Sequence, residues 1–96
     1  MGIRREVTLT GTLRCVTQAE VARVRAALPD HIKLTRAEAG CIAFEVTPTD
    51  DPMVWDVAER FTDAAAFEAH QTRAAASLWA KETQGIARDY AIAGLE

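Results

Sequence analysis

Alternation of hydrophobic and polar residues predicts half-buried β-strands in several segments of the chain. In segment 5–15, valine and leucine side chains face one way and threonines the other. In segment 41–48, the alternation places Ile42, Phe44 and Val46 on one face. Segment 53–61 follows the same rule, and the polar stretch TDDP before it predicts a hairpin turn. We expect a last strand at residues 86–95.

The stretch TQAE has the arrangement of a capping box, with Thr17 as the N-cap and Glu20 at the third helical position. Apolar residues follow at helical spacing, so a helix is predicted to begin here. Pro29 lacks the amide hydrogen that an inner turn needs, and we expect it to end or bend this helix. A second helical stretch is predicted as far as Glu38, with Gly40 as its stop.

An alanine-rich segment capped by Thr62 or Asp63 predicts one further helix, which runs to about Thr83 and is ended by Gly85. The order is therefore strand, helix, strand, strand, helix, strand. This order is typical of the ferredoxin-like α+β fold, in which a four-stranded antiparallel sheet has both helices on one face. Residues 1–96 are expected to form this single domain.

The other face of the predicted sheet would present the threonines of the first strand, together with Ala43, Glu45, Val54 and Ala58. These side chains are too small and too mixed for an ordinary solvated face, and too polar for a core. The same face of a second copy would cover them, so the sequence predicts a homodimer.

Glu59 and His70 are predicted to face one another. Parity along the third strand places Glu59 beside Trp55, under the helices. On the following helix, His70 shares an inward stripe with Phe67 and Leu78. One interpretation is a structural hydrogen bond that fixes the helix on the sheet. The other is a cavity in which both groups polarise or deprotonate a bound ligand.

Composition and charge limit the classes of function. Hydrophobic residues make up 49% of the chain and charged residues 26%, as in ordinary globular domains. The net charge of −3 and the scattered Lys and Arg argue against nucleic-acid binding. No apolar run is long enough to span a membrane. Cys15 and Cys41 lack a CxxC spacing, so we expect two reduced cysteines in a cytoplasmic protein.

The remaining polar residues have simpler expected roles. His31 is expected at the surface of its helical segment. Arg60, Arg73 and Arg88 are expected to be solvated, although one of them could bind an acidic group of a substrate. No set of His, Cys, Asp and Glu recurs at ligand spacing, so no metal site is expected.

Three stretches carry a likeness to a known family. They are TRAEAGCIAFEV (35–46), DDPMVWDVAERF (50–61) and AAFEAHQT (65–72). Together with the element order, they resemble the antibiotic biosynthesis monooxygenase domain family of the dimeric α+β barrel superfamily. The resemblance extends over nearly the whole chain.

This resemblance implies a tight homodimer whose sheets join into a barrel, with a pocket in each subunit. It also implies oxidation of small phenols or hydroquinones to quinones, with molecular oxygen as co-substrate and no metal, flavin or other cofactor. The haem-degrading branch of the family uses an asparagine and a later histidine on the second helix. This chain has neither, so haem breakdown is not expected.

Glu59 and His70 match the strand-three carboxylate and the helix histidine of the family. The resemblance therefore implies that His70 is the catalytic acid/base or hydrogen-bond donor and that Glu59 orients it. Four aromatic residues would shape the substrate pocket: Trp55, Phe67, Trp79 and Tyr90. Two alternatives remain on the same scaffold. One is a non-catalytic small-ligand-binding or structural dimer, and the other is a polyketide isomerase or cyclase.

Overall fold

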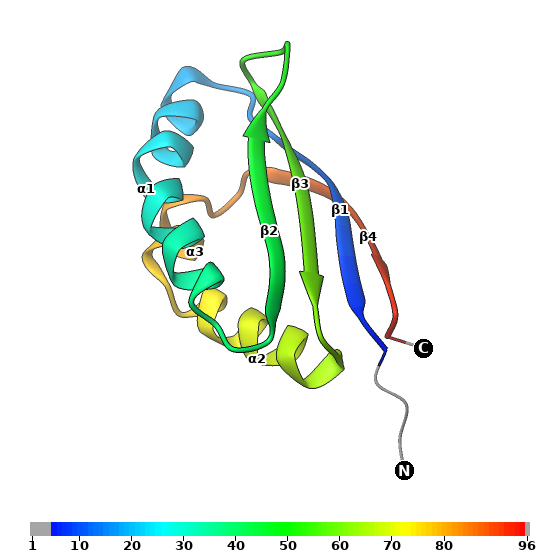
Figure 1. The fold of residues 1–96 in the computed structure, drawn as a ribbon. Coiled ribbons are helices and arrows are strands. Elements are labelled where there is room, and N and C mark those ends of the chain that lie inside the picture. The colour runs from blue at the N-terminus through cyan, green and yellow to red at the C-terminus, as the bar shows by residue number, and fades with distance from the viewer. Residues whose placement is uncertain (1–4, 96) are drawn as a thin grey trace.

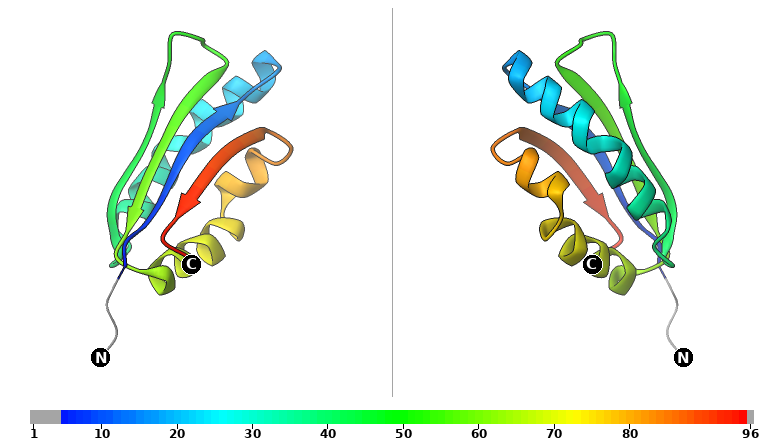
Figure 2. Two further views of the ribbon diagram at one scale, coloured as in Figure 1. Left: turned by 90° about the vertical axis from the view of Figure 1, so that its right-hand side faces the viewer. Right: turned by 90° about the vertical axis from the view of Figure 1, so that its left-hand side faces the viewer.

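Four antiparallel strands form one sheet in the order β2-β3-β1-β4, and three helices cover one of its faces (Figures 1 and 2). The computed structural model describes residues 5–95. The predicted ferredoxin-like arrangement is confirmed, with its second helix divided in two. The elements are β1 (Val7–Arg14), α1 (Gln18–Arg36), β2 (Cys41–Pro48), β3 (Val54–Phe61), α2 (Ala64–Ala75), α3 (Leu78–Glu82) and β4 (Ala87–Ala93).

The core lies between the sheet and the helices, because alternate strand residues and one side of each longer helix turn toward each other. Its largest fully enclosed hydrophobic side chains are Phe44, Phe61, Leu13, Val7 and Val24. Within residues 5–95, no helix combines the length and the apolar character needed to cross a membrane.

The opposite face of the sheet is not covered by any of the described helices (Figure 2). At its centre, Thr10 pairs with Ala58 on β3 and with Ala91 on β4, and all three are exposed. Val54, which was also predicted on this face, is buried where the hairpin turn bonds to its backbone.

Pro29 does not end α1, which was one of the two outcomes predicted for it. The helix begins after Thr17, whose Oγ1 accepts a hydrogen bond from the Glu20 amide at 3.1 Å, and it runs unbroken to Arg36. Pro29 lies on the exposed side, where the carbonyl group that has lost its amide partner can bond to water. Packing of the inner side thus outweighs the lost bond. The buried residues continue at helical spacing past the proline: Val21, Val24, Ala27, His31 and Thr35.

The predicted second helix is two helices that meet at Ser77. Ser77 Oγ donates to the Ala74 carbonyl at 2.6 Å and accepts from the Ala80 amide at 3.4 Å. The serine hydroxyl therefore competes with the helical backbone bonds, closing α2 and capping α3. The change of direction leaves Leu78, which was predicted to face inward, 61% exposed. It also brings Trp79 against α1.

A β-bulge in β2 changes the direction of Ile42. The pairing with β3 shifts between Cys41 and Ala43, so Ile42 is the extra residue of the bulge. Ile42 is exposed, whereas Phe44 and Val46 are buried as predicted. Strict alternation predicted the wrong face because it holds only where no residue is inserted in the ladder.

Candidate active site

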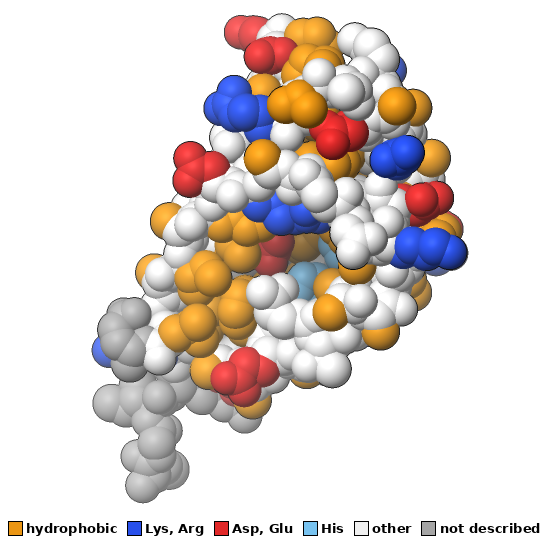
Figure 3. Space-filling model, turned by 180° about the vertical axis from the view of Figure 1, so that it is seen from behind, with side chains coloured by type: hydrophobic (Ala, Val, Ile, Leu, Met, Phe, Trp, Pro, Cys, Tyr) orange, Lys and Arg blue, Asp and Glu red, His pale blue; other side chains and the backbone are white. Residues whose placement is uncertain are grey.

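A cavity of about 470 Å³ lies between the sheet and the helices, and every element except β2 contributes to its wall. Figure 3 shows the hollow, with histidine and acidic atoms inside it and basic atoms beside them. Within residues 5–95, no three His, Cys, Asp or Glu side chains converge in a way that would hold a metal ion. The ionisable residues of the wall are His31, Glu59, His70, Arg88 and Tyr90.

Glu59 and His70 approach each other in this cavity, as the sequence predicted. Alternation along β3 turns Glu59 inward, and the buried side of α2 holds His70. The two residues are 7% and 3% exposed. His70 Nε2 lies 3.8 Å from Glu59 Oε1, which is longer than a hydrogen bond. The structural hydrogen bond that was one interpretation of this pair is therefore not formed.

The hydrogen bond that orients His70 involves Glu38, which the sequence analysis did not select. His70 Nδ1 lies 2.9 Å from Glu38 Oε1. Glu38 Oε2 accepts a hydrogen bond from Arg73 Nε at 2.5 Å, and Arg73 also donates to Thr35 Oγ1 at 2.9 Å. Arg73, expected to be solvated, is thus part of a partly buried network. Glu38 lies in the turn after α1, where no periodicity indicates the direction of a side chain.

This network determines where the proton of His70 lies. An ionised carboxylate can only accept hydrogen bonds, so His70 donates to Glu38 through Nδ1–H. Burial lowers the pKa of His70 below its ordinary value, although the Glu38 carboxylate opposes this shift. We infer a neutral imidazole whose unprotonated Nε2 is directed toward Glu59. Such a nitrogen can accept a proton from a bound ligand.

Glu59 has a perturbed ionisation. Burial, together with the negative charge of Glu38, raises the pKa of Glu59 to about 7. Its Oε1 is buried and has no hydrogen-bond partner among the described residues. Near neutral pH the carboxyl group is therefore divided between its protonated and ionised forms, and it can act as a second proton carrier beside His70.

His31 is buried, and the prediction of a surface residue was wrong. The ring is 5% exposed and lines the cavity. It stacks on Trp79 with a centroid distance of 4.7 Å and 3° between the planes, and its edge contact with Phe44 spans 5.2 Å. The predicted interruption at Pro29 hid the fact that His31 continues the buried side of α1. Burial, with the nearby positive charges, lowers the pKa of His31 to about 3.

Arg88 and Tyr90 close the cavity from β4. Arg88 donates to the backbone oxygens of Thr83 and Ile86 at 3.2 and 3.0 Å, and to the Thr83 hydroxyl at 2.7 Å. Burial raises the pKa of Tyr90, so its phenol stays protonated near neutral pH. A fixed guanidinium and an uncharged phenol therefore border the cavity. Arg60, by contrast, forms an exposed ion pair with Glu6.

Only two of the four aromatic residues predicted to shape the pocket line this cavity. Trp79 and Tyr90 belong to its wall, whereas Trp55 and Phe67 do not. Trp55 is buried in the core near the other end of β3. Phe67 is also buried and packs edge-to-face on Phe61 at 5.7 Å. Parity and helical spacing show that a residue faces inward, but they do not distinguish a packed core position from a cavity wall.

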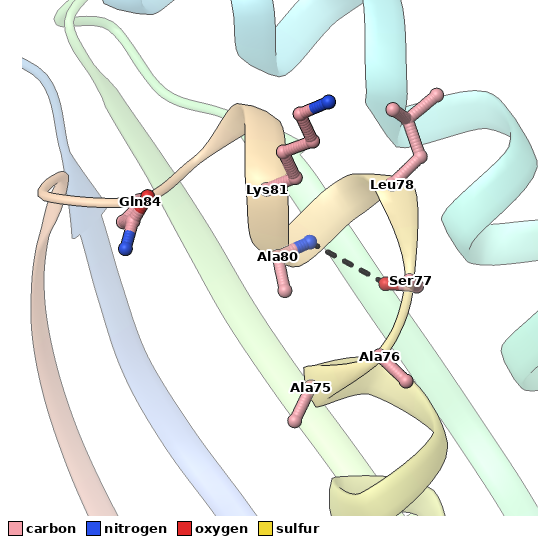
Figure 4. A pocket seen from close by; sticks show the side chains of 7 residues that line it. All are labelled: Ala75, Ala76, Ser77, Leu78, Ala80, Lys81 and Gln84. Carbon is pink, nitrogen blue, oxygen red and sulfur yellow. Dashed lines mark hydrogen bonds between the residues drawn. The ribbon is translucent and has the colours of Figure 1, made fainter.

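A second hollow, of about 560 Å³, lies at the turn between α2 and α3 (Figure 4). Three alanines line it together with Leu78, Ser77 and Gln84, and Lys81 is the single ionisable side chain among these residues. Figure 4 shows that the polar ends of Lys81 and Gln84 lie on different sides of α3. This hollow therefore lacks the converging polar groups that the cavity beside His70 has.

Residues 7–82 match the sequence model of a family described as antibiotic biosynthesis monooxygenase. The chain belongs to the antibiotic biosynthesis monooxygenase family. The family suggested by the three sequence stretches is thus confirmed. No curated protein matches the chain in sequence.

Solved structures of low sequence identity share this fold. A Nitrosomonas europaea protein, itself assigned only provisionally as an antibiotic biosynthesis monooxygenase, is 18% identical with a TM-score of 0.80, over 98% of this chain and 93% of that one. A protein of unknown function from the same organism is 24% identical with a TM-score of 0.73, over 98% and 92%. A Bacteroides thetaiotaomicron protein of unknown function is 18% identical with a TM-score of 0.74, over 94% and 95%. These likenesses establish the fold alone.

Replacement of Glu59 by glutamine is expected to stabilise the protein increasingly as the pH rises from about 4.5 to about 7. In this window the carboxyl group of the unfolded chain is ionised while the buried one keeps its proton, so folding takes up a proton. The stability that protonated Glu59 provides below pH 4.5 is therefore lost as the pH rises through 7. Urea unfolding measures the difference in unfolding free energy between Glu59→Gln and the wild type. This difference should change by an amount on the order of 2–3 kcal/mol between the two ends of the pH window.

Glu68→Gln, on the exposed side of α2, is the matched control. Its unfolding free energy should differ from that of the wild type by an amount that does not change with pH. His31 and His70 titrate with the opposite sign, but they are present in all three proteins. If the unfolding free energies of the wild type and Glu59→Gln changed with pH in parallel, the raised pKa of Glu59 would be contradicted.

Proposed function

We propose that this protein is a cofactor-independent monooxygenase that oxidises small phenols or hydroquinones to quinones with molecular oxygen. The main support is the environment of His70, whose Nδ1 is bonded to Glu38 while Nε2 is enclosed beside Glu59. Membership of the family agrees with this class of reaction. Trp79 and Tyr90 in the cavity wall suit a planar substrate.

The first step is the removal of the phenolic proton. His70 Nε2 accepts it, and the imidazolium that forms lies against the Glu38 carboxylate, whose charge favours the protonated ring. Glu38 therefore acts as a positioning residue that also stabilises the charged state. Enclosure of the phenolate excludes water from the reduced-oxygen species that follow.

Molecular oxygen then takes four electrons from the substrate. The phenolate gives one electron to oxygen, the two radicals join in a carbon–oxygen bond, and His70 returns its proton to the distal oxygen. The ring carbon next loses its hydrogen as a proton to Glu59, the electron pair of that C–H bond forms the carbonyl, and the oxygen–oxygen bond breaks to release hydroxide. Glu59, which ionises near neutral pH, then passes this proton to the hydroxide to give water, and these steps use no metal or flavin. The phenolic and the ring hydrogen thus become the water.

His70→Gln is expected to lower kcat for oxygen uptake with a responsive hydroquinone by about 10²–10⁴-fold, since it removes the proton acceptor. Glu38→Gln should reduce kcat less and change its pH profile, because it alters the orientation and proton affinity of His70. An oxygen electrode, a panel of hydroquinones and anthrones, and metal-free protein suffice for the measurement. Glu68→Gln serves as the control with unchanged uptake.

The same assay separates the alternatives. Saturable binding of the panel without oxygen uptake by the wild type would favour a ligand-binding module. Turnover under argon would indicate an isomerase or cyclase that uses the same two proton carriers. Uptake that survives His70→Gln at the wild-type rate would contradict the proposed base.

We also infer that the protein acts as a homodimer joined through the sheet face that no described helix covers. Members of this family are usually dimeric. The exposed small residues at the centre of that face, Thr10, Ala58 and Ala91, would let two sheets approach closely.

Ala58→Glu is expected to convert the dimer to a monomer, because it places a charge at the centre of the buried face. Sedimentation velocity measures the change in mass. Ala26→Glu, on the exposed side of α1, is the control that should remain dimeric. A monomeric wild type would contradict the proposed dimer. A dimer unaffected by Ala58→Glu would show that the interface lies elsewhere.

A further inference from the structure

His31 is a buried polar residue of the cavity wall that the proposed reaction does not use. It is 5% exposed, and its Nδ1 has no hydrogen-bond partner among the described residues. Burying an unpaired polar nitrogen opposes folding. A histidine kept in the cavity wall at this cost needs an explanation, and a use for its other ring nitrogen, Nε2, toward a ligand in that cavity is one.

Packing alone does not require the nitrogens of this ring. The face of His31 lies flat on Trp79, at a centroid distance of 4.7 Å, and its edge contacts Phe44 at 5.2 Å. A phenyl ring has a similar shape and can make both contacts. These contacts instead hold the imidazole in one orientation beside His70, whose ring centroid is 6.0 Å away.

The protonation of His31 differs from that of His70. Burial, together with the charge that His70 carries once protonated and the charges of Arg73 and Arg88, lowers the pKa of His31 to about 3, so the ring is neutral at physiological pH. An unpaired buried acceptor is tolerated more readily than an unpaired N–H donor. We therefore assign the unpaired Nδ1 as the acceptor, which leaves the proton on Nε2. His31 is then a hydrogen-bond donor, whereas His70 presents an acceptor.

We propose that His31 is a specificity-determining residue that donates a hydrogen bond to a second oxygen of the aromatic substrate, while the first oxygen meets His70. The separation of the two rings places both within reach of one bound aromatic molecule. The preferred substrates are aromatic rings with a hydroxyl group and a second oxygen acceptor, such as hydroquinones and hydroxyaryl ketones. A quinone product keeps an acceptor at the same position.

This inference rests on the function proposed for the cavity, but its test needs no turnover. Anaerobic calorimetry would compare 1,4-dihydroxynaphthalene with 1-naphthol, which lacks the second oxygen. His31→Phe should weaken binding of the diol about five- to tenfold, the effect of one hydrogen bond, and leave 1-naphthol within about twofold of the wild type. The same variant should raise Tm, because it removes an unpaired buried nitrogen. His31→Gln, which keeps an N–H donor at a similar reach, should retain part of the preference for the diol.

If His31 only packed against its neighbours and did not contact the ligand, the result would differ. Equal weakening of both ligands in His31→Phe, or a lower Tm, would overturn the proposal, as would unchanged binding of the diol or failure of the wild type to bind either naphthol. Selective loss of the diol would support it even if the wild type consumed no oxygen. That outcome would separate substrate recognition from the monooxygenase reaction.

Discussion

The hydrogen bond between His70 and Glu38 is the interaction on which the geometry of the cavity depends. It joins α2 to the turn after α1, and Arg73 extends the connection to Thr35 on α1. Apolar contacts hold helices on a sheet without fixing their position strictly, whereas charge-assisted hydrogen bonds impose a geometry. The same bond places a proton on Nδ1. The packing of the helices and the chemical state of Nε2 therefore have one origin.

Burial and neighbouring charges give side chains of the same type different protonation behaviour in this small protein. His31 has a pKa of about 3 and keeps a neutral ring, while Glu38 counteracts part of the effect of burial on His70. Glu59, close to the negative charge of Glu38, titrates near pH 7. Groups whose environments separate their ionisation in this way can divide the roles of donor, base and proton carrier among them. The proposed reaction needs only these roles and an enclosed, planar space.

Much of this arrangement could be predicted from the sequence, and the failures have physical causes. Alternation and helical spacing were enough for the element order and for the approach of Glu59 to His70, because both depend on local periodicity. Local rules failed at Pro29, where the packing of a whole helix side outweighs one lost hydrogen bond. The direction of the Glu38 side chain depends on a turn and on His70, which lies 32 residues further along the chain, so no local pattern predicts it. His31 was misplaced because its direction depends on the helix continuing past Pro29.

The protonation of His70 can be observed directly by nitrogen-15 NMR of the imidazole ring. The predicted result at neutral pH is a neutral ring with its proton on Nδ1 and an unprotonated Nε2, in a spectrum that changes in Glu38→Gln. A ring with its proton on Nε2, or an imidazolium at neutral pH, would contradict the account, because Nε2 would then have no lone pair with which to accept a proton from a bound phenol.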